Sequence, residues 1–374
     1  EGVRTDARVC NLSYLQTDWY IDQMRRPAYD SPSLPISWTR LQYVTGTREG
    51  IPVQPDALQQ VIDYYKDSPE DLKQMLGDNP YELKNIIRHW VLNDNPDLQI
   101  FPTDSIVVTV DKEAVKRSGM MIAADSIPDV MHISLKGKRA VYKSEMMMLE
   151  MISQANWERP LYMSTTVGPD NYGHLGDNFV QEGLACRITP FDTKQSGRTI
   201  DSERMYNNMM NKFKYGGLKE NPDIYLDETV IRMCYTHRRL FNQLAQQLLK
   251  EGQKDKALKV LQRAEEEIPG SIVPHEAFYG HSLELADAWL ALGHKAEAEK
   301  LLNAVGQNAK EYIEWYLSLN TQRLLQSSRE CLMQIYILND IAKTWEPIDK
   351  KKAETYRMEV NNYASRCHQR GMSL

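Results

Sequence analysis

The sequence contains few cysteines, and they are spread along the chain. Five occur among the 374 residues: Cys10, Cys186, Cys234, Cys331 and Cys367. No two of them form a CxxC pair, and their number is odd. Disulfide-stapled domains and zinc knuckles both need closely spaced cysteines. Both classes are therefore excluded, and the cysteines are interpreted as isolated, mostly buried thiols.

Long apolar runs are also missing. No stretch approaches the roughly 18 apolar residues of a membrane span, and the densest run, 146–152, is interrupted by Glu150. No signal peptide is recognisable. The chain begins with Glu1 rather than Met. We therefore expect either that a leader was removed or that the chain is a piece of a longer protein.

The chain has no excess of positive charge. It carries 45 Lys and Arg against 51 Asp and Glu, a net charge of −6, and its pI is about 5.8. A nucleic-acid partner is therefore not expected. The composition, 42% hydrophobic and 26% charged, excludes disordered and collagen-like chains. The length predicts two or three domains.

Familiar catalytic motifs are absent as well. There is no GxSxG, no GxGxxG and no P-loop lysine. His275-Glu276 is followed by His281, but this spacing does not put two histidines on one helix face as HExxH does. We therefore predict no catalytic residue, no metal ligand and no cofactor.

Residues 1–195 alternate between short apolar runs and helical patterns. Strands are expected at 7–12, 105–110, 131–135 and 161–167, and helices at 17–24, 55–65, 68–77, 79–90, 143–154 and 179–187. Alternation of this kind predicts an α/β domain with a mainly parallel sheet. Because a core-type strand opens the pattern at once, the domain is expected to be truncated at its N-terminus.

A connecting segment, 196–234, follows, and the rest of the chain is predicted to be almost entirely helical. Residues 241–269 and 285–305 follow the tetratricopeptide pattern of large and small residues. The turn glycines of the two copies, Gly252 and Gly293, are 41 positions apart. The regular period is about 34 residues, so an insertion is expected near 269–278. Residues 235–374 are thus predicted to form an all-α, tetratricopeptide-like domain.

Two carboxylates on the first helix are a candidate site. Asp18 and Asp22 are four residues apart, on either side of Trp19, and so share one helix face. This face lies at the end of a predicted strand, where open α/β sheets bind ligands. In the alternative interpretation, Asp18 only stabilises the helix N-terminus by charge and Asp22 is solvated.

The glycine-bearing loop 168–176 is a second candidate. It joins a predicted strand to a predicted helix, so its backbone amides could bind an anion. Asn171 and Tyr172 lie in this loop, and Glu182 is placed on the helix behind it, where it could face the same crevice. In the alternative interpretation the segment is only a long β–α turn.

Three segments together carry a family resemblance. They are ARVCNLSYLQTDWYIDQM at 7–24, WERPLYMSTTV at 157–167 and QEGLACRITP at 181–190. In order and spacing they resemble the C-terminal, non-membrane part of a bacterial family of multi-pass membrane proteins of unknown function. That family is described as protein O-mannosyltransferase-like, of the GT-C glycosyltransferase type. The resemblance covers about residues 1–195.

The resemblance implies that membrane spans, a further strand and a further helix lie upstream of this chain. In GT-C enzymes the catalytic carboxylate usually lies in an early extracytoplasmic loop, so no catalytic residue is carried over. The matched positions Asp18, Trp19, Asp22 and Glu182 become candidates for a surface that faces a ligand or acceptor. By the same resemblance, the chain would face the periplasm.

We therefore expect the periplasmic part of a membrane-bound glycosyltransferase-like protein. It would position an acceptor polypeptide or a protein partner, the latter through the helical repeats, and would not be catalytic alone. One alternative is a protein interaction module on an α/β scaffold. Another is a soluble enzyme that acts on sugars or phosphates through the glycine loop.

Overall fold

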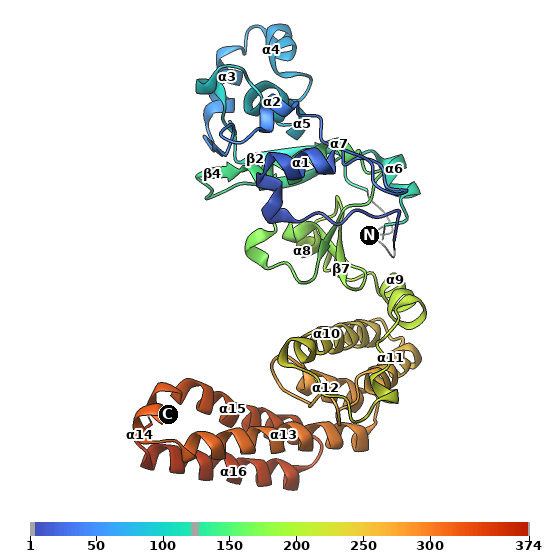
Figure 1. Ribbon diagram of the computed structural model, residues 1–374, viewed down its shortest axis with the longest axis vertical. Helices are drawn as coiled ribbons and strands as arrows, with labels where there is room; N and C mark the ends of the chain where they lie inside the picture. Colours follow the sequence, from blue (N-terminus) through green and yellow to red (C-terminus); the bar gives the residue numbers. More distant parts are fainter. Residues whose placement is uncertain (1–3, 121–126, 373–374) are drawn as a thin grey trace. The chain divides into compact units, whose positions relative to one another are not determined.

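The computed structural model describes residues 4–120 and 127–372. The chain divides into two compact units, Glu1–Asp201 and Ser202–Leu374 (Figure 1). The first unit combines helices with small sheets, and the second is helical. The predicted class, an α/β domain followed by an all-α domain, is confirmed.

The first unit contains fifteen of the elements used below. Its helices are α1 (Asp18–Met24), α2 (Arg40–Tyr43), α3 (Ala57–Tyr64), α4 (Pro69–Leu76), α5 (Leu83–Ile86), α6 (Lys112–Arg117), α7 (Lys143–Ala155) and α8 (Thr193–Ser196). Its strands are β1 (Gly50–Pro52), β2 (Ser105–Thr109), β3 (Val130–Ser134), β4 (Ala140–Tyr142), β5 (Tyr162–Ser164), β6 (Phe179–Gln181) and β7 (Ala185–Ile188).

These strands form three small antiparallel sheets, with the orders β1-β4, β2-β3 and β5-β7-β6. The expectation of a mainly parallel sheet is therefore wrong. The connection between β6 and β7 shows the physical reason. Only residues 182–184 separate the two strands, whereas a parallel pair needs a crossover of about a dozen residues.

The helix expected at 179–187 is also wrong, because the β6–β7 hairpin occupies these positions. Phe179 and Val180 are buried and suit a sheet. Gly183, with φ 136°, supplies the turn conformation. Short apolar runs do not distinguish a buried strand from a buried helix by periodicity alone. Glu182 therefore lies in a hairpin turn and not on a helix.

The strand expected at 7–12 does not form either. Residues 7–11 make no strand pairing in the described part of the chain, and Leu12–Gln16 is a 3₁₀ helix. Val9 shows the cause, since its side chain is 69% exposed. An apolar run becomes a strand only where a ladder partner and a core face are both present.

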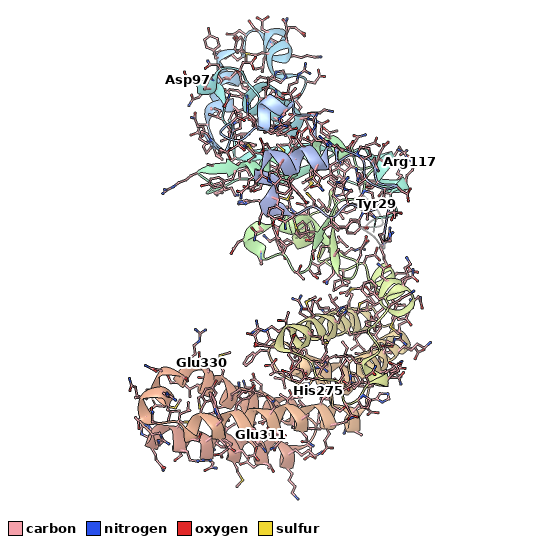
Figure 2. The ribbon with its side chains drawn as sticks, in the orientation of Figure 1. Tyr29, Asp97, Arg117, His275, Glu311 and Glu330 are labelled. Carbon is pink, nitrogen blue, oxygen red and sulfur yellow. The ribbon has the colours of Figure 1, made fainter. Side chains whose placement is uncertain are left out.

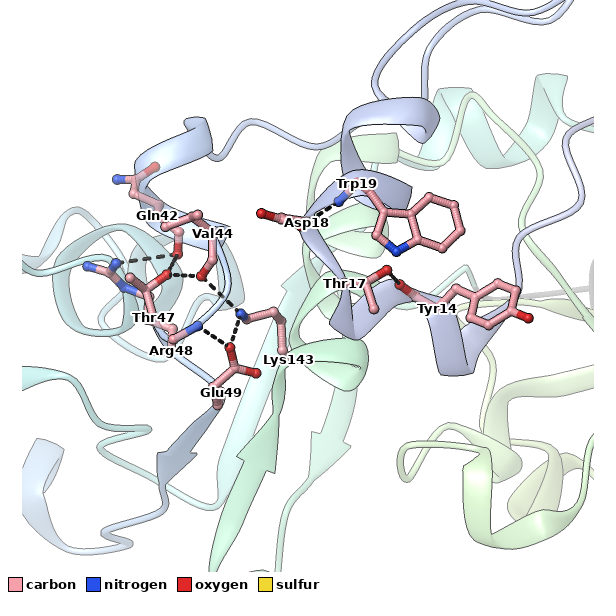
Figure 3. A network of polar contacts seen from close by, with 11 residues as sticks. Tyr14, Thr17, Asp18, Trp19, Gln42, Val44, Thr47, Arg48, Glu49 and Lys143 are labelled. Atoms are coloured by element: carbon pink, nitrogen blue, oxygen red, sulfur yellow. Dashed lines mark hydrogen bonds and ion pairs between the residues drawn. The ribbon is translucent and has the colours of Figure 1, made fainter.

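Helix α7 lies at the centre of the core of the first unit. Its four methionines (Met146, Met147, Met148 and Met151) are all buried, as expected for residues that fill an irregular core. Lys143, at the start of the helix, is fully buried. Its Nζ lies 2.7 Å from Glu49 Oε1 and 3.3 Å from the Val44 carbonyl oxygen (Figure 3). This ion pair joins α7 to the segment before β1.

The second unit is built from helical hairpins. Its helices are α9 (Ser202–Asn207), α10 (Glu228–Lys250), α11 (Lys254–Glu267), α12 (Ser282–Ala291), α13 (Lys295–Ser318), α14 (Thr321–Gln326), α15 (Ser328–Trp345) and α16 (Lys350–Gln369). Helices α10 and α11, α12 and α13, and α15 and α16 pack as pairs. Gly252 and Gly293 have φ of 76° and 83° in the turns of the first two pairs, a conformation that glycine adopts without strain.

The large and small residues of the proposed repeat form the interior of these hairpins. Leu244, Ala245, Leu248, Ala257, Leu261, Ala264, Leu285, Ala286, Trp289, Ala298, Leu302 and Val305 are all buried. The small side chains allow the paired helices to approach closely, and the large ones fill the remaining space.

A buried arginine fixes the segment between α11 and α12. Arg238 of α10 is only 1% exposed. Its guanidinium donates hydrogen bonds to the carbonyls of Ile268 (3.0 Å), Val273 (2.8 Å) and Pro274 (3.0 Å). The inserted segment is therefore anchored to the hairpin stack and has a defined structure.

Candidate functional site

The acidic pair on α1 shares one helix face, and a neighbouring arginine compensates its charge. Arg40 Nη2 lies 3.6 Å from Asp18 Oδ2, and Arg40 Nη1 donates to Asp22. The Tyr43 hydroxyl donates to Asp22 Oδ1 at 2.6 Å. Asp18 Oδ1 accepts the backbone N–H of Trp19 at 2.8 Å, at the N-terminus of the helix (Figure 3). Asp18 thus lies at the helix N-terminus as in the alternative interpretation, whereas Asp22 is held by Arg40 and Tyr43 and is not simply solvated.

Trp19 is the part of this region that remains open. Its side chain is 55% exposed, packs edge-on against Tyr20 and is tilted by 51° against the ring of Tyr14. Together with Asp22 and Arg26 it lines a pocket of about 440 Å³. This surface is thus accessible, but its carboxylates already have partners within the chain.

Glu182 belongs to a buried polar cluster in the β5-β7-β6 sheet. It is 6% exposed, and its Oε2 accepts the Tyr162 hydroxyl at 2.8 Å. Arg187 Nη1 lies 3.8 Å from Glu182 Oε1, and Arg187 Nη2 donates to the Ser118 carbonyl at 3.0 Å. The carboxylate therefore faces its own sheet and serves to hold it together.

A larger cavity lies along β3. It measures about 800 Å³ and is lined by residues of β2 and β3, of the segment 174–180 and of the segment 190–198. A cavity of about 350 Å³, lined by Lys138, Tyr172 and others, adjoins it. The two cavities share Ser134, His174 and Asp177. Together they form one surface feature, which we call the polar groove.

The loop 168–176 forms one wall of the polar groove in a strained conformation. Gly173 and His174 both have left-handed backbones, with φ of 55° and 64°. For a residue with a side chain this conformation costs on the order of 1 kcal/mol, and it persists only where packing enforces it. His174 is held in this way at the junction of the two cavities. Such strain is common at binding sites.

Three acidic side chains of the polar groove already have partners within the chain. Asp177 Oδ2 lies 2.7 Å from Lys194 Nζ, and Asp129 Oδ1 lies 2.7 Å from Lys112 Nζ. Asp192 Oδ1 caps α8 by accepting two backbone N–H groups. Arg198 makes no ion pair with a described residue. The described lining contains no cluster of Lys and Arg side chains. It therefore suits a neutral ligand rich in hydrogen-bonding groups better than a phosphate.

The structure does not bring the candidates from the sequence into one site. Tyr172 lines the polar groove, and Asn171 is exposed on the 3₁₀ turn Pro169–Asn171 beside it. Trp19 and Asp22 line a separate pocket, and Glu182 lines neither cavity. Of the candidates, the loop 168–176 thus contributes to the polar groove, whereas the acidic pair and Glu182 lie outside it.

Several residues that line the polar groove were not predicted from the sequence. His132 and Ser134 are exposed on β3, while Met131 and Ile133, which alternate with them, are buried. This period-two alternation in the sequence was the available signal for a polar strand face. His174, Asp192 and Arg198 gave no such signal, because the backbone of irregular segments brings them to the groove.

The described part of the chain contains no group of three or more His, Cys, Asp or Glu side chains suited to a metal ion. His275, in the segment between α11 and α12 (Figure 2), is 5% exposed, and its Nε2 lies 3.6 Å from Glu265 Oε2. This histidine therefore packs inside the helical unit.

No helix of the described residues is both long enough and apolar enough to span a membrane.

The fold and the polar groove together define an α/β domain with a polar groove on its surface, joined to a helical unit. Residues 1–208 match the family described as TMEM260-associated domain 2. Since the match covers more than half of the chain, the chain belongs to this family, whose domain is one associated with a membrane protein. No curated protein and no solved structure matches the chain.

Proposed function

We propose that this chain is the periplasmic part of a membrane-bound, glycosyltransferase-like protein and that it positions an acceptor polypeptide. The polar groove carries the proposal. It is the largest cavity described above, and a strained histidine and paired carboxylates line it. Family membership supports the link to a membrane protein. The O-mannosyltransferase-like character and the periplasmic location follow from the resemblance of the three segments.

The lining of the groove fits a polypeptide rich in hydroxyl and amide groups. Serine hydroxyls, histidine rings and the amide of Gln195 offer both donors and acceptors. Phe191 adds an apolar contact. Such a surface can orient a flexible chain without a fixed charge pattern.

Binding of unstructured Ser/Thr-rich peptides to the purified chain tests this proposal. Fluorescence anisotropy with the unchanged chain should give saturable binding. Ser134→Trp places a large ring on the exposed face of β3 within the groove and should reduce the affinity at least tenfold. Asn171→Trp, on the exposed turn beside the groove, is the matched control and should bind like the unchanged chain. Equal binding by all three proteins would contradict the proposal.

The proposal includes no turnover by this chain alone. The carboxylates described above are held in ion pairs, helix caps or buried hydrogen bonds. The purified chain, incubated with a lipid-linked sugar and a Ser/Thr-rich peptide, should produce no glycosylated peptide. Transfer above the level of a heat-denatured sample would overturn this part.

The helical unit supports a second candidate function, a protein interaction module. Aromatic side chains are exposed on it: Phe278 (41%), Tyr279 (64%), Tyr312 (46%) and Trp315 (54%). Exposed aromatic residues are enriched at protein interfaces. In this case Trp315→Ala should abolish partner binding while Ser134→Trp leaves it intact, which separates the two candidates.

A further inference from the structure

The hydrogen-bonding register of β3 leaves one edge of this strand open. β2 and β3 pair antiparallel, with Ile106 opposite Ile133 and Val108 opposite Met131. Backbone hydrogen bonds from Val110 to Asp129 and from Leu135 to Asp104 extend this ladder at its two ends. In an antiparallel pair, alternate residues point their N–H and C=O groups toward the partner strand and away from it.

The register therefore directs the backbone groups of Val130, His132 and Ser134 away from β2. In the described part of the chain, no strand or isolated bridge pairs with this side of β3, and no backbone hydrogen bond joins these three residues to another segment. A row of donors and acceptors that repeats every second residue is a template for another extended chain.

The open edge also lacks the features by which proteins usually protect such edges. Natural edge strands carry lysine, proline or a bulge, or are covered by another element. Residues 130–134, VMHIS, contain neither lysine nor proline, and they pair with β2 in continuous register without a bulge. Residues 130–134 thus contain no side chain or bulge that would prevent another strand from pairing with this edge.

The polar groove runs along this strand. Four of the five residues of β3 line it (Val130, His132, Ile133 and Ser134). Ile133 is itself 1% exposed, with its side chain in the core. Asp177, Asn178 and the segment 190–198 also line the cavity. The cavity therefore adjoins the strand whose outer edge is unpaired, and side chains of other segments line it as well.

We propose that an extended segment of the acceptor polypeptide binds in the polar groove as an additional strand on the open edge of β3. This inference rests on the proposed function and specifies the binding mode. A peptide backbone supplies alternating C=O and N–H groups that match Val130, His132 and Ser134, which a sugar or a phosphate does not. Main-chain pairing gives affinity for many sequences, and the polar wall selects hydroxyl-rich side chains.

Two matched variants of the full chain test this binding mode. His132→Pro removes an N–H group that points out of the sheet, so it breaks no ladder hydrogen bond with β2. His132→Ala removes the imidazole but keeps the N–H. Against a fluorescent ten-residue Ser/Thr-rich peptide, His132→Pro should lose at least tenfold in affinity and His132→Ala less than threefold. Far-ultraviolet circular dichroism and thermal unfolding establish that both variants are folded.

The same peptide, N-methylated at alternate residues, provides a test that does not depend on the variants. Methylation of one set of alternate amides should reduce affinity at least tenfold, while methylation of the other set should change it less than threefold.

Equal effects of the two sets, or equal binding by the two His132 variants, would overturn the strand-addition mode while peptide binding itself sustains the proposed function. Failure of every peptide to bind would overturn both. A concentration-dependent dimer that His132→Pro abolishes would assign the edge to a second copy of the chain instead, and would overturn the inference.

Discussion

A Cβ atom at Gly173 would lie 2.3 Å from the Cε atom of Met148. The loop that walls the polar groove is thus packed directly onto the buried methionine face of α7, with no room for a side chain between them. The left-handed backbone of Gly173 continues into His174, which lines both cavities of the groove. The position of the groove wall therefore depends on the core of the first unit.

Gly173→Ala should destabilise the first unit by about 2 kcal/mol, because alanine combines left-handed strain with a contact that Met148 must move to relieve. It should also weaken peptide binding, since it displaces His174. Gly168→Ala is the control, because Gly168 has φ −72° and no atom within 4 Å of an added Cβ. Urea unfolding of both variants measures the effect, and equal midpoints would contradict this account of the loop.

The Glu49 and Lys143 ion pair should make the first unit sensitive to acid. Burial acts to raise the pKa of Glu49, but the hydrogen bonds from Lys143 and the Gly46 N–H outweigh it and bring that pKa below its ordinary value of 4.5. A carboxyl whose pKa is lowered on folding contributes stability above its ordinary pKa. That contribution is lost as the pH falls through the folded-state pKa.

Glu49→Gln should therefore lower the free energy of unfolding at pH 7 by about 1–2 kcal/mol. This is less than for a fully buried pair, because the Glu49 side chain is 52% exposed. The difference from the unchanged chain should shrink at pH 3. Asp6→Asn disrupts the exposed pair with Arg4 and should have little effect at either pH. A Glu49→Gln deficit that stays constant between pH 7 and pH 3 would be inconsistent with this assignment.

Arg238 should be essential for the helical unit and unimportant for the groove. Arg238→Lys keeps the charge but cannot reach three carbonyls with one planar fork, so it should lower the stability of this unit by about 2–3 kcal/mol. Arg239→Lys is the neighbouring control, since no hydrogen bond or ion pair joins Arg239 to a described residue through its side chain. If the two variants unfold alike, the anchoring role of Arg238 is wrong.

Cys331 and Cys367 should resist alkylation in the folded protein. Their Sγ atoms lie 3.8 Å apart, and both side chains are fully buried. Burial, together with the neighbouring thiol, raises the pKa of Cys331 to about 12, and burial also raises the pKa of Cys367. Because the thiolate is the reactive form, iodoacetamide at pH 8 should label both at least a hundredfold more slowly in native than in guanidinium-unfolded protein. Comparable rates in mass spectrometry would show that this helix pair opens readily.

The fold could be predicted from sequence where local signals were strong. Pro69 and Gly77 bound α4, and the methionine-rich segment became the buried helix α7. Prediction failed where a short apolar run had no intrinsic preference for helix or strand. Residues 179–187 became a hairpin because β6 and β7 pair with each other and β5 pairs with β7, whereas residues 7–11 found no strand partner in the described part of the chain. Pairing of this kind is set by tertiary contacts.

The candidate site was only partly predictable for a related reason. Tyr172 lies in the glycine-bearing loop, whose composition marked it. The polar groove, however, is lined by β3, by this loop and by the segment 190–198, which belong to different parts of the first unit, and no local pattern in the sequence predicts that they meet. Asp22 and Glu182 were candidates because they are acidic. In the structure, Asp22 forms an ion pair with Arg40, and Glu182 accepts a hydrogen bond from the Tyr162 hydroxyl.

Hydrogen exchange measured by mass spectrometry, with and without a saturating Ser/Thr-rich peptide, tests the central claim most directly. The outward-facing amides of β3 have no partner in the described structure, so they should exchange quickly in the unbound chain and slow down on binding. We expect new protection in 127–135 and in 172–198, and none in 282–305. Protection confined to the helical hairpins, with β3 unchanged, would contradict the account and assign acceptor binding to the helical unit.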